Sequence, residues 1–396
     1  MQSHKSNSLE TTQHQRPNLY SRLPEVGTSI FAVMSKMAME HGAINLSQGF
    51  PDFPVDEKLI ELVHRYMLEG HNQYAPMPGV LGLREAIAEV VEKTYHLKVS
   101  AENNITITAG ATQAIHACIS AVVKPGDEVI IFDPAYDSYE PAIRLNGGVA
   151  VRINLTYPGF SVDWDLVKDS INEKTRLIII NTPHNPTGTV LSDEDLSTLA
   201  EITMRHDIYV LSDEVYERIL FDQRAHKTVL STASLAERSM AVYSFGKTFH
   251  ATGWKCGYII APEKLTAEIR KCHQFIVFSV NTPMQWALAT YLKTPDHYEQ
   301  LSRFYQRKRD FFLERIQGTS FKPLPCHGSY FQLMSFENFS DKADVAVAEQ
   351  LTRELKLATI PLSVFYHDKT DNRLLRFCFA KKEETLEKAA EILRGI

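Results

Sequence analysis

The chain has 396 residues, of which 44% are hydrophobic and 23% charged, and its formal net charge is -6. This size and composition predict a globular protein with one large domain and a smaller one. The mild negative charge lacks the basic stripe that nucleic-acid binding requires, so we expect no nucleic-acid partner. Five scattered cysteines without a CxxC pair argue against a disulfide framework and indicate a reducing cytoplasm. Because residues 1–18 are polar and no later apolar run could span a bilayer, we expect neither export nor membrane insertion.

Short apolar runs alternate with amphipathic stretches along most of the chain. This pattern is typical of parallel strands that crossover helices cover on both faces, so it predicts an α/β sheet. Ser192 is the expected N-cap of one of these helices. In chain order, we predict strands at 104–108, 128–132, 176–181, 208–212, 240–245 and 257–261, and helices at 112–123, 137–145 and 193–206.

The pattern changes after Pro262, becoming mostly helical until Gln317, and Pro323 and Pro325 then mark a boundary. A second, smaller α/β unit is expected beyond it, and a helix at 28–38 is expected to join this unit from the other end of the chain. Its predicted elements are strands at 329–335 and 374–379, a helix at 345–355 and a helix after Lys382. We therefore divide the chain into a polar arm (1–19), a segment packing with the small domain (20–48), a large domain (49–300) and a small domain (301–396).

Ligands bind at the carboxyl ends of strands in an open parallel sheet, so the residues that follow each apolar run are informative. The segment 108–113 consists of small and polar residues that lead into a helix, where free backbone N–H groups suit an anion such as phosphate. Close packing alone explains such residues as well. In the segment 181–188, two X-Pro steps predict an extended Asn185 with an amide available to a ligand, although a plain turn is the alternative.

Two further strand ends carry charged residues. Asp213, followed by Tyr216, comes after a buried strand, where a carboxylate needs a cation such as a protonated pyridine nitrogen or an arginine. Lys247 lies between two strand-like runs, with Ser244 and Lys255 nearby as candidate phosphate contacts. A partly desolvated lysine held near other cations suits a Schiff base with a cofactor aldehyde, whereas a lysine taken at random is a solvated surface residue.

Four motifs together resemble the class I/II pyridoxal 5'-phosphate-dependent aminotransferases of fold type I. They are Asn185-Pro186-Thr187-Gly188, Ser212-Asp213-Glu214-Val215-Tyr216, Ser244-Phe245-Gly246-Lys247-Thr248 and Arg376-Phe377-Cys378-Phe379. The resemblance extends from about Tyr20 to the end of the chain. The segments 44–53 and 72–76 are most similar to the branch that contains kynurenine and bacterial methionine aminotransferases. Fold type I implies a large domain with a mostly parallel seven-stranded sheet and a smaller α/β domain.

The resemblance also implies roles for individual residues. Lys247 would form the covalent link to pyridoxal 5'-phosphate and act as the acid/base catalyst, while Asp213 would pair with the ring nitrogen. Tyr216 and Asn185 would donate to the phenolic oxygen of the ring. The ring would stack on Tyr136, and the phosphate would contact Ala111, Thr112, Ser244 and Lys255.

The implied substrate contacts begin with Arg376, whose planar fork suits an α-carboxylate. The alternative of a surface arginine is weakened by its position inside the apolar run 374–379. Gly49 and Asn185 would contribute to the same amino-acid site. Tyr74 would reach the phosphate of a neighbouring subunit, which makes a homodimer the expected partner. The side-chain pocket would involve Ile30, Tyr74, Tyr136 and Phe278, a set that favours methionine and also admits Phe, Tyr, His and kynurenine.

Two departures from kynurenine-type members, Ser279 and Thr112, argue against kynurenine as the principal substrate. A carbon-sulfur β-lyase acting on cysteine conjugates or cystathionine would use the same cofactor chemistry and is the nearest alternative. A non-catalytic regulator built on the same domain is a remote one. We expect no metal site, because the 15 histidines form no HExxH motif and the cysteines no CxxC pair.

Overall fold

The computed structural model describes residues 19–396, and the predicted polar arm therefore lies almost wholly outside the described residues. Its largest sheet has seven strands in the order β2-β8-β7-β6-β5-β3-β4. Neighbouring strands from β4 to β7 are parallel, and β8 runs antiparallel to both of its neighbours. The strands are β2 Ile105–Thr108, β3 Glu128–Asp133, β4 Val149–Asn154, β5 Thr175–Asn181, β6 Tyr209–Asp213, β7 Ser239–Ser244 and β8 Gly257–Ile260.

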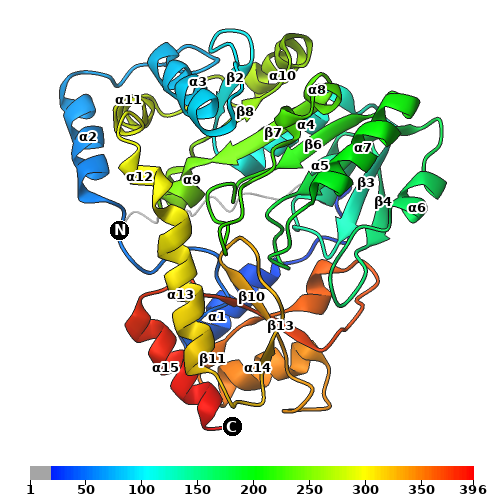
Figure 1. Ribbon diagram of the computed structural model, residues 1–396, viewed down its shortest axis with the longest axis vertical. Helices are drawn as coiled ribbons and strands as arrows, with labels where there is room; N and C mark the ends of the chain where they lie inside the picture. Colours follow the sequence, from blue (N-terminus) through cyan, green and yellow to red (C-terminus); the bar gives the residue numbers. More distant parts are fainter. Residues whose placement is uncertain (1–18) are drawn as a thin grey trace, which may run out of the picture.

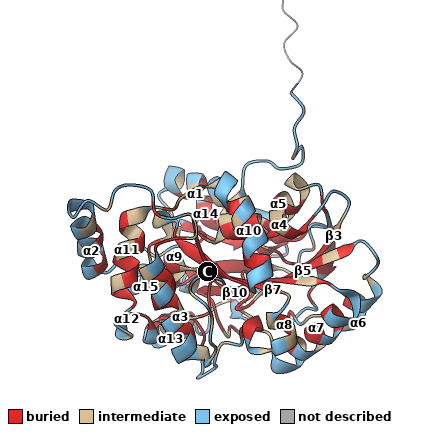
Figure 2. Cartoon of the chain, turned by 90° about the horizontal axis from the view of Figure 1, so that it is seen from above, coloured by how far each residue is buried: buried red, intermediate tan, exposed pale blue. Residues whose placement is uncertain are grey.

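Helices cover both faces of this sheet, and alternate strand residues point to different helices. Val129 and Ile131 belong to a hydrophobic core shared with α4 Ala111–Val122, α5 Tyr139–Leu145 and α10 Glu263–Ile276. Ile130 belongs to a second core, shared with α7 Asp193–His206. Figure 2 shows the buried strands between helices whose outer faces are exposed. This two-sided burial explains why the strands are continuous apolar runs in the sequence.

Two smaller sheets lie below the large one in Figure 1. Four strands pair in the order β12-β13-β10-β9, and β1 pairs in parallel with β11. Strand β1 follows helix α1 Ile30–His41, so its pairing with β11 joins this N-terminal helix to the C-terminal part of the fold. The bounds are β1 Ile44–Asn45, β9 Lys322–Pro323, β10 Phe331–Ser335, β11 Leu357–Ala358, β12 Ile360–Pro361, β13 Leu374–Cys378, α14 Asp344–Arg353 and α15 Glu383–Arg394.

The remaining helices precede the first strand of the large sheet, lie between its strands or lead from it to the smaller sheets. The region after Pro262 is helical as predicted, and α13 leads from the large sheet toward the smaller ones in Figure 1. The domain boundaries after residues 48 and 300 remain our proposal. These helices are α2 Glu57–Leu68, α3 Leu81–Tyr95, α6 Trp164–Asp169, α8 Ala233–Ala236, α9 Phe245–Thr248, α11 Thr282–Tyr291, α12 Asp296–Glu299 and α13 Leu301–Arg315, with short 3-10 turns η1 Val229–Ser231, η2 Thr252–Trp254 and η3 Leu362–Phe365.

Local sequence signals explain several element ends. The Ser192 hydroxyl accepts from the Asp195 N–H, and the Asp195 carboxylate accepts from the Ser192 N–H, so α7 begins with a complete capping box. Gly42 ends α1 in the left-handed conformation, with a φ of 61°, that glycine adopts readily. The six predicted strands of the large sheet and the six predicted helices are confirmed, with ends that differ by a few residues.

Strand β4 was absent from the strand set predicted by apolar runs. It stands at the edge of the sheet, and its first residue, Val149, is 52% exposed. Arg152 in the same strand forms ion pairs with Asp133 and Glu140. An edge strand needs no continuous apolar run, so the signal that reveals the central strands is weak here. A membrane-crossing helix, which needs about 20 apolar residues, is not found among residues 19–396.

Gly257 occupies a point where three elements meet, and we predict that Gly257→Ala destabilises the protein. A Cβ there would lie 2.5 Å from the Tyr243 carbonyl oxygen and 3.3 Å from the Ala111 nitrogen. Backbone atoms cannot yield as a flexible side chain does, so the free energy of unfolding should fall by about 1–3 kcal/mol. Gly253→Ala is the matched control, because nothing lies within 4 Å of its added Cβ. Equal stability of the two variants in urea denaturation would contradict this account.

Candidate active site

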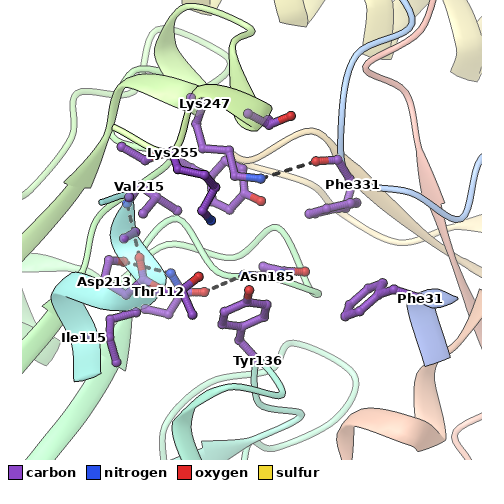
Figure 3. Close-up of a pocket in the computed structure, with 18 of the residues that line it drawn as sticks. Phe31, Thr112, Ile115, Tyr136, Asn185, Asp213, Val215, Lys247, Lys255 and Phe331 are labelled. Carbon is purple, nitrogen blue, oxygen red and sulfur yellow. Dashed lines mark hydrogen bonds between the residues drawn. The ribbon is translucent and has the colours of Figure 1, made fainter. Parts of the chain in front are cut away.

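A cavity of about 310 Å³ lies at the carboxyl edge of the parallel strands. The strands β5, β6 and β7 end at Asn181, Asp213 and Ser244, and all three residues line the cavity. Figure 3 shows Lys247 and Lys255 on one side of it and Tyr136 on the other. The sheet topology thus brings together side chains that are more than a hundred residues apart in the sequence, as expected for an open α/β sheet.

Lys247 lies on the short helix α9, immediately after β7. Its Nζ donates to the Tyr330 hydroxyl at 2.7 Å and to the Gly49 carbonyl oxygen at 3.3 Å. Burial lowers its pKa from 10.5 to about 8, and the positive charges of Arg376 and Lys255 act in the same direction. A neutral amine is therefore accessible near neutral pH, which is the property that a nucleophilic lysine needs.

Asp213 ends β6 and is almost completely buried. Its Oδ2 accepts from the Tyr139 hydroxyl at 2.7 Å, and its Oδ1 accepts from the Val215 N–H at 3.4 Å. Burial raises its pKa from 3.8 to about 6, although both hydrogen bonds and Lys247 oppose this rise. In the described residues, no arginine forms an ion pair with Asp213 within 4 Å, so the arginine partner considered from the sequence is not found. A cationic ligand would favour the ionised carboxylate.

The amino end of α4 forms a cradle for an anion. Gly110 precedes the helix with a φ of 78°, and no side chain caps this end. A Cβ on Gly110 would lie 3.4 Å from Lys255 Nζ, so glycine allows the lysine to approach the backbone. The first amides of α4 and the Lys255 ammonium therefore face one region of the cavity, where Ser244 and Thr112 supply hydroxyl groups. Helix ends of this kind favour phosphate.

Arg376 is fully buried at the centre of β13. Its Nη1 donates to Asn185 Oδ1 at 2.8 Å and its Nη2 donates to the Ser47 carbonyl oxygen at 3.0 Å, whereas its Nε has no partner. The Phe331 ring lies 3.9 Å from the guanidinium carbon. Burial lowers the pKa of Arg376 to about 10. A buried guanidinium without an anionic partner is costly, which makes this side chain a ready site for a carboxylate.

Two tyrosines complete the side of the cavity near Asp213. Burial raises the pKa of Tyr216 above its ordinary value, so its hydroxyl stays protonated and can donate. Tyr136 packs edge-to-face on Tyr139, at 5.7 Å between ring centroids, and Tyr139 in turn holds Asp213. Because the oxygen of Asn185 is turned toward Arg376, its NH₂ group is the end available to a ligand.

The structure brings most of the predicted site residues to this one cavity. Three predicted residues lie elsewhere. Tyr74 and Phe278 pack together on the surface, at 5.1 Å between ring centroids, and are 81% and 53% exposed. Ile30 lines a neighbouring groove instead. The predicted residues that line the cavity are Gly49, Ala111, Thr112, Tyr136, Asn185, Asp213, Tyr216, Ser244, Lys247, Lys255 and Arg376.

Sequence reasoning missed several residues at the site. Phe31 and Phe331 line the cavity from α1 and β10, and Tyr330 contacts Lys247. Tyr139, which donates a hydrogen bond to Asp213, begins helix α5 shortly after Tyr136. Of these four residues, only Tyr139 carried a usable signal, because it lies close in sequence to Tyr136, which the sequence had already singled out. Within the described residues, no group of three or more His, Cys, Asp or Glu side chains could hold a metal ion.

Comparison with known proteins agrees with this geometry. Residues 41–393 match the family model described as aminotransferase class I and II. The chain is 51% identical to methionine aminotransferase of Escherichia coli K12, over 95% of this chain and 98% of that protein. It is 31% identical to human kynurenine–oxoglutarate transaminase 1, over 94% of this chain and 97% of that protein.

Solved structures give the same result. The crystal structure of an Escherichia coli protein with an identified methionine aminotransferase function superimposes with a TM-score of 0.94 at 50% identity, covering 96% of this chain and all of that one. N-Succinyldiaminopimelate aminotransferase from Mycobacterium tuberculosis gives 0.91 at 35% identity, covering 95% and 99%. The chain therefore belongs to the class I and II aminotransferases, which depend on pyridoxal 5'-phosphate.

Proposed function

We propose that this aminotransferase takes the amino group of an apolar, thioether or aromatic L-amino acid, with methionine preferred, and passes it to a 2-oxo acid. The observation that carries the proposal is the buried Arg376, flanked by Phe31 and Phe331, in the same cavity as Lys247. The guanidinium suits the α-carboxylate, and the rings suit an apolar side chain. The names of the relatives in Escherichia coli and humans support this substrate class.

The residues of the cavity fit pyridoxal 5'-phosphate. The α4 cradle, Ser244 and Lys255 offer N–H groups, a hydroxyl and a positive charge to its phosphate. The Asp213 carboxylate suits the ring nitrogen, and the Lys247 amine suits the aldehyde. When bound, the cofactor accepts the electron pair left by loss of the substrate α-proton.

In this scheme Lys247 moves protons at its Nζ atom. With a pKa of about 8, the released amine exists partly neutral at neutral pH and accepts the substrate α-proton. The Lys247 Nζ atom then holds this proton as an ammonium and donates it in a later step. One side chain therefore serves first as a base and then as an acid. Its hydrogen bonds to Gly49 and Tyr330 limit the positions that the amine can take.

Asp213, Asn185 and Tyr216 fix the ring and its charge. An ionised Asp213, oriented by Tyr139, would keep a bound pyridine nitrogen protonated, because opposite charges in a buried site stabilise each other. The Asn185 amide and the Tyr216 hydroxyl would donate to the ring's phenolic oxygen. Tyr136 offers a ring face for stacking.

Arg376 orients the substrate. A guanidinium fork binds a carboxylate through two parallel hydrogen bonds, which fixes the direction of the bond from Cα to hydrogen relative to Lys247. The Gly49 backbone adds to the same carboxylate site. Ile30 and Phe278 remain proposed contacts for the substrate side chain.

We also propose that the enzyme acts as a homodimer in the cytoplasm. Tyr74 and Phe278 pack together and are exposed, and Phe275, which precedes Phe278 closely in the chain, is 88% exposed. Exposed aromatic side chains of this kind suit an interface. In the dimer, Tyr74 would reach the cofactor phosphate of the second subunit. The cytoplasmic location is supported by all five cysteines being unpaired.

An amino-donor panel tests the reaction and its substrate class. Methionine, phenylalanine and tyrosine should each shift the absorption of the bound cofactor and yield a 2-oxo acid, at least about tenfold faster than aspartate, because a second carboxylate finds apolar rings in place of a cation. The measurement is the rate of each half-reaction by stopped-flow absorption. Release of pyruvate and ammonia from cystathionine, with no consumption of 2-oxo acid, would identify the β-lyase reaction instead.

Lys247→Ala should abolish turnover while leaving the cofactor site in place. We expect kcat to fall by at least about a hundredfold, because the proton-transfer group is lost. The phosphate cradle remains, so equilibrium dialysis should still detect bound pyridoxal 5'-phosphate. Lys264→Ala, on the exposed face of α10, is the control and should keep full activity. Wild-type turnover in Lys247→Ala would remove this lysine from the mechanism.

The amine of Lys247 in cofactor-free protein should titrate near pH 8, well below the ordinary lysine value of 10.5. Since folding depresses this pKa, the contribution of Lys247 to the free energy of unfolding is fully present above pH 10.5. It is lost as the pH falls through 10.5 toward 8. Reductive methylation followed by peptide mass spectrometry measures the titration. A midpoint near 10.5 would show that the amine is solvated.

A further inference from the structure

Tyr330 lies next to the reacting amine but outside the cavity. It directly precedes β10, is fully buried and is absent from the residues that line the cavity. Its hydroxyl accepts a hydrogen bond from Lys247 Nζ at 2.7 Å and donates a short one to the Gly49 carbonyl oxygen. The Lys247 amine is therefore held from behind by a group that neither substrate nor cofactor needs to touch.

The carbonyl of Gly49 sets the direction of these hydrogen bonds. A carbonyl oxygen only accepts, so the single Tyr330 proton goes to Gly49 and the Tyr330 oxygen is left to accept from Lys247. Burial raises the pKa of Tyr330 well above its ordinary value, which keeps the phenol protonated and this direction constant. Lys247 also donates directly to Gly49, so the amine, the phenol and the Gly49 carbonyl form a closed triangle.

Each corner of this triangle comes from a different part of the fold. Lys247 follows β7 of the large sheet, Tyr330 precedes β10 of the smaller one, and Gly49 lies on the segment between β1 and α2. That segment is held on its other side by Lys381, whose Nζ donates to the Phe50 carbonyl oxygen at 2.8 Å. The Tyr330 hydroxyl thus links Lys247 to the segment that contains Gly49, whose backbone is a proposed contact of the substrate carboxylate.

We propose that Tyr330 is a positioning residue that holds the Lys247 amine, and with it the Gly49 carbonyl, whenever the lysine is not bonded to the cofactor. This inference rests on the proposed function. A lysine has four rotatable bonds, and a free amine in an unrestrained site samples many positions that are useless for proton transfer. The Tyr330 oxygen accepts a hydrogen bond from the amine and so holds Lys247 Nζ between Tyr330 and the cavity. Removing the Tyr330 hydroxyl should therefore lower kcat, because substrate binding does not involve Tyr330.

The chain provides a close control in Tyr305. It is fully buried in the same aromatic cluster, at 5.7 Å between the Tyr305 and Tyr330 ring centroids. Its hydroxyl has no hydrogen-bond partner among the described residues. Tyr305→Phe and Tyr330→Phe therefore each remove one buried oxygen, but only Tyr330→Phe removes a contact with Lys247.

We expect Tyr330→Phe to lower kcat for methionine by about tenfold with KM changed less than about twofold, and Tyr305→Phe to change neither. In cofactor-free protein, Tyr330→Phe should move the Lys247 titration midpoint about one unit lower, because an acceptor for the ammonium is lost. Tyr305→Phe should leave the midpoint in place. The two variants behaving alike in both kcat and midpoint would overturn the proposal.

A double-mutant cycle keeps the test independent of turnover. In cofactor-free protein, the stability effects of Tyr330→Phe and Lys247→Ala should be non-additive, whereas those of Tyr305→Phe and Lys247→Ala should add. Additivity in both cycles would also overturn the proposal, even if Tyr330→Phe unfolds more easily. A wild-type protein that transaminates no amino acid but shows the Tyr330 coupling would refute the proposed function alone.

Discussion

The burial of three ionisable side chains around one cavity is the constraint on which the rest of this structure depends. Desolvation raises the pKa of Asp213 and lowers those of Lys247 and Arg376, so it disfavours the charged form of all three groups. A folded protein tolerates such groups when a ligand supplies the missing partners. A cofactor with a cationic ring nitrogen and an aldehyde, together with a substrate carboxylate, answers all three needs.

The fold supplies rigid supports for these groups. Asp213 ends β6 and Lys247 follows β7, two adjacent parallel strands of the large sheet, whereas Arg376 lies within an antiparallel strand of the smaller one. The residues that we propose for catalysis and substrate binding are therefore held by two sheets, and their relative position depends on contacts between those sheets. The segment around Gly49 is such a contact, because its carbonyl group accepts from Lys247 on one side and from Tyr330 on the other.

The sequence predicted the parts of the site that have a local cause. Asp213 and Lys247 follow buried apolar runs, and Arg376 lies inside one, so each is conspicuous as a charge in an apolar setting. Phe31 and Tyr330 have no such signal, because an aromatic residue in an apolar stretch is ordinary core until the tertiary fold places it. The edge strand β4 was missed for a related reason, since its exposure removes the pattern of two-sided burial.

Asn185 lies between Arg376, the proposed contact of the substrate, and the proposed position of the cofactor ring. Its side-chain oxygen accepts from Arg376 and its backbone N–H donates to Asn181 Oδ1, so the side chain and the backbone of Asn185 are each held by one hydrogen bond. The NH₂ group is thereby directed away from Arg376, toward the part of the cavity where the cofactor's phenolic oxygen would lie. A carboxylate that binds Arg376 competes for the same guanidinium donors. We therefore propose that substrate binding at Arg376 and a hydrogen bond from Asn185 to the cofactor ring would be coupled through this one amide.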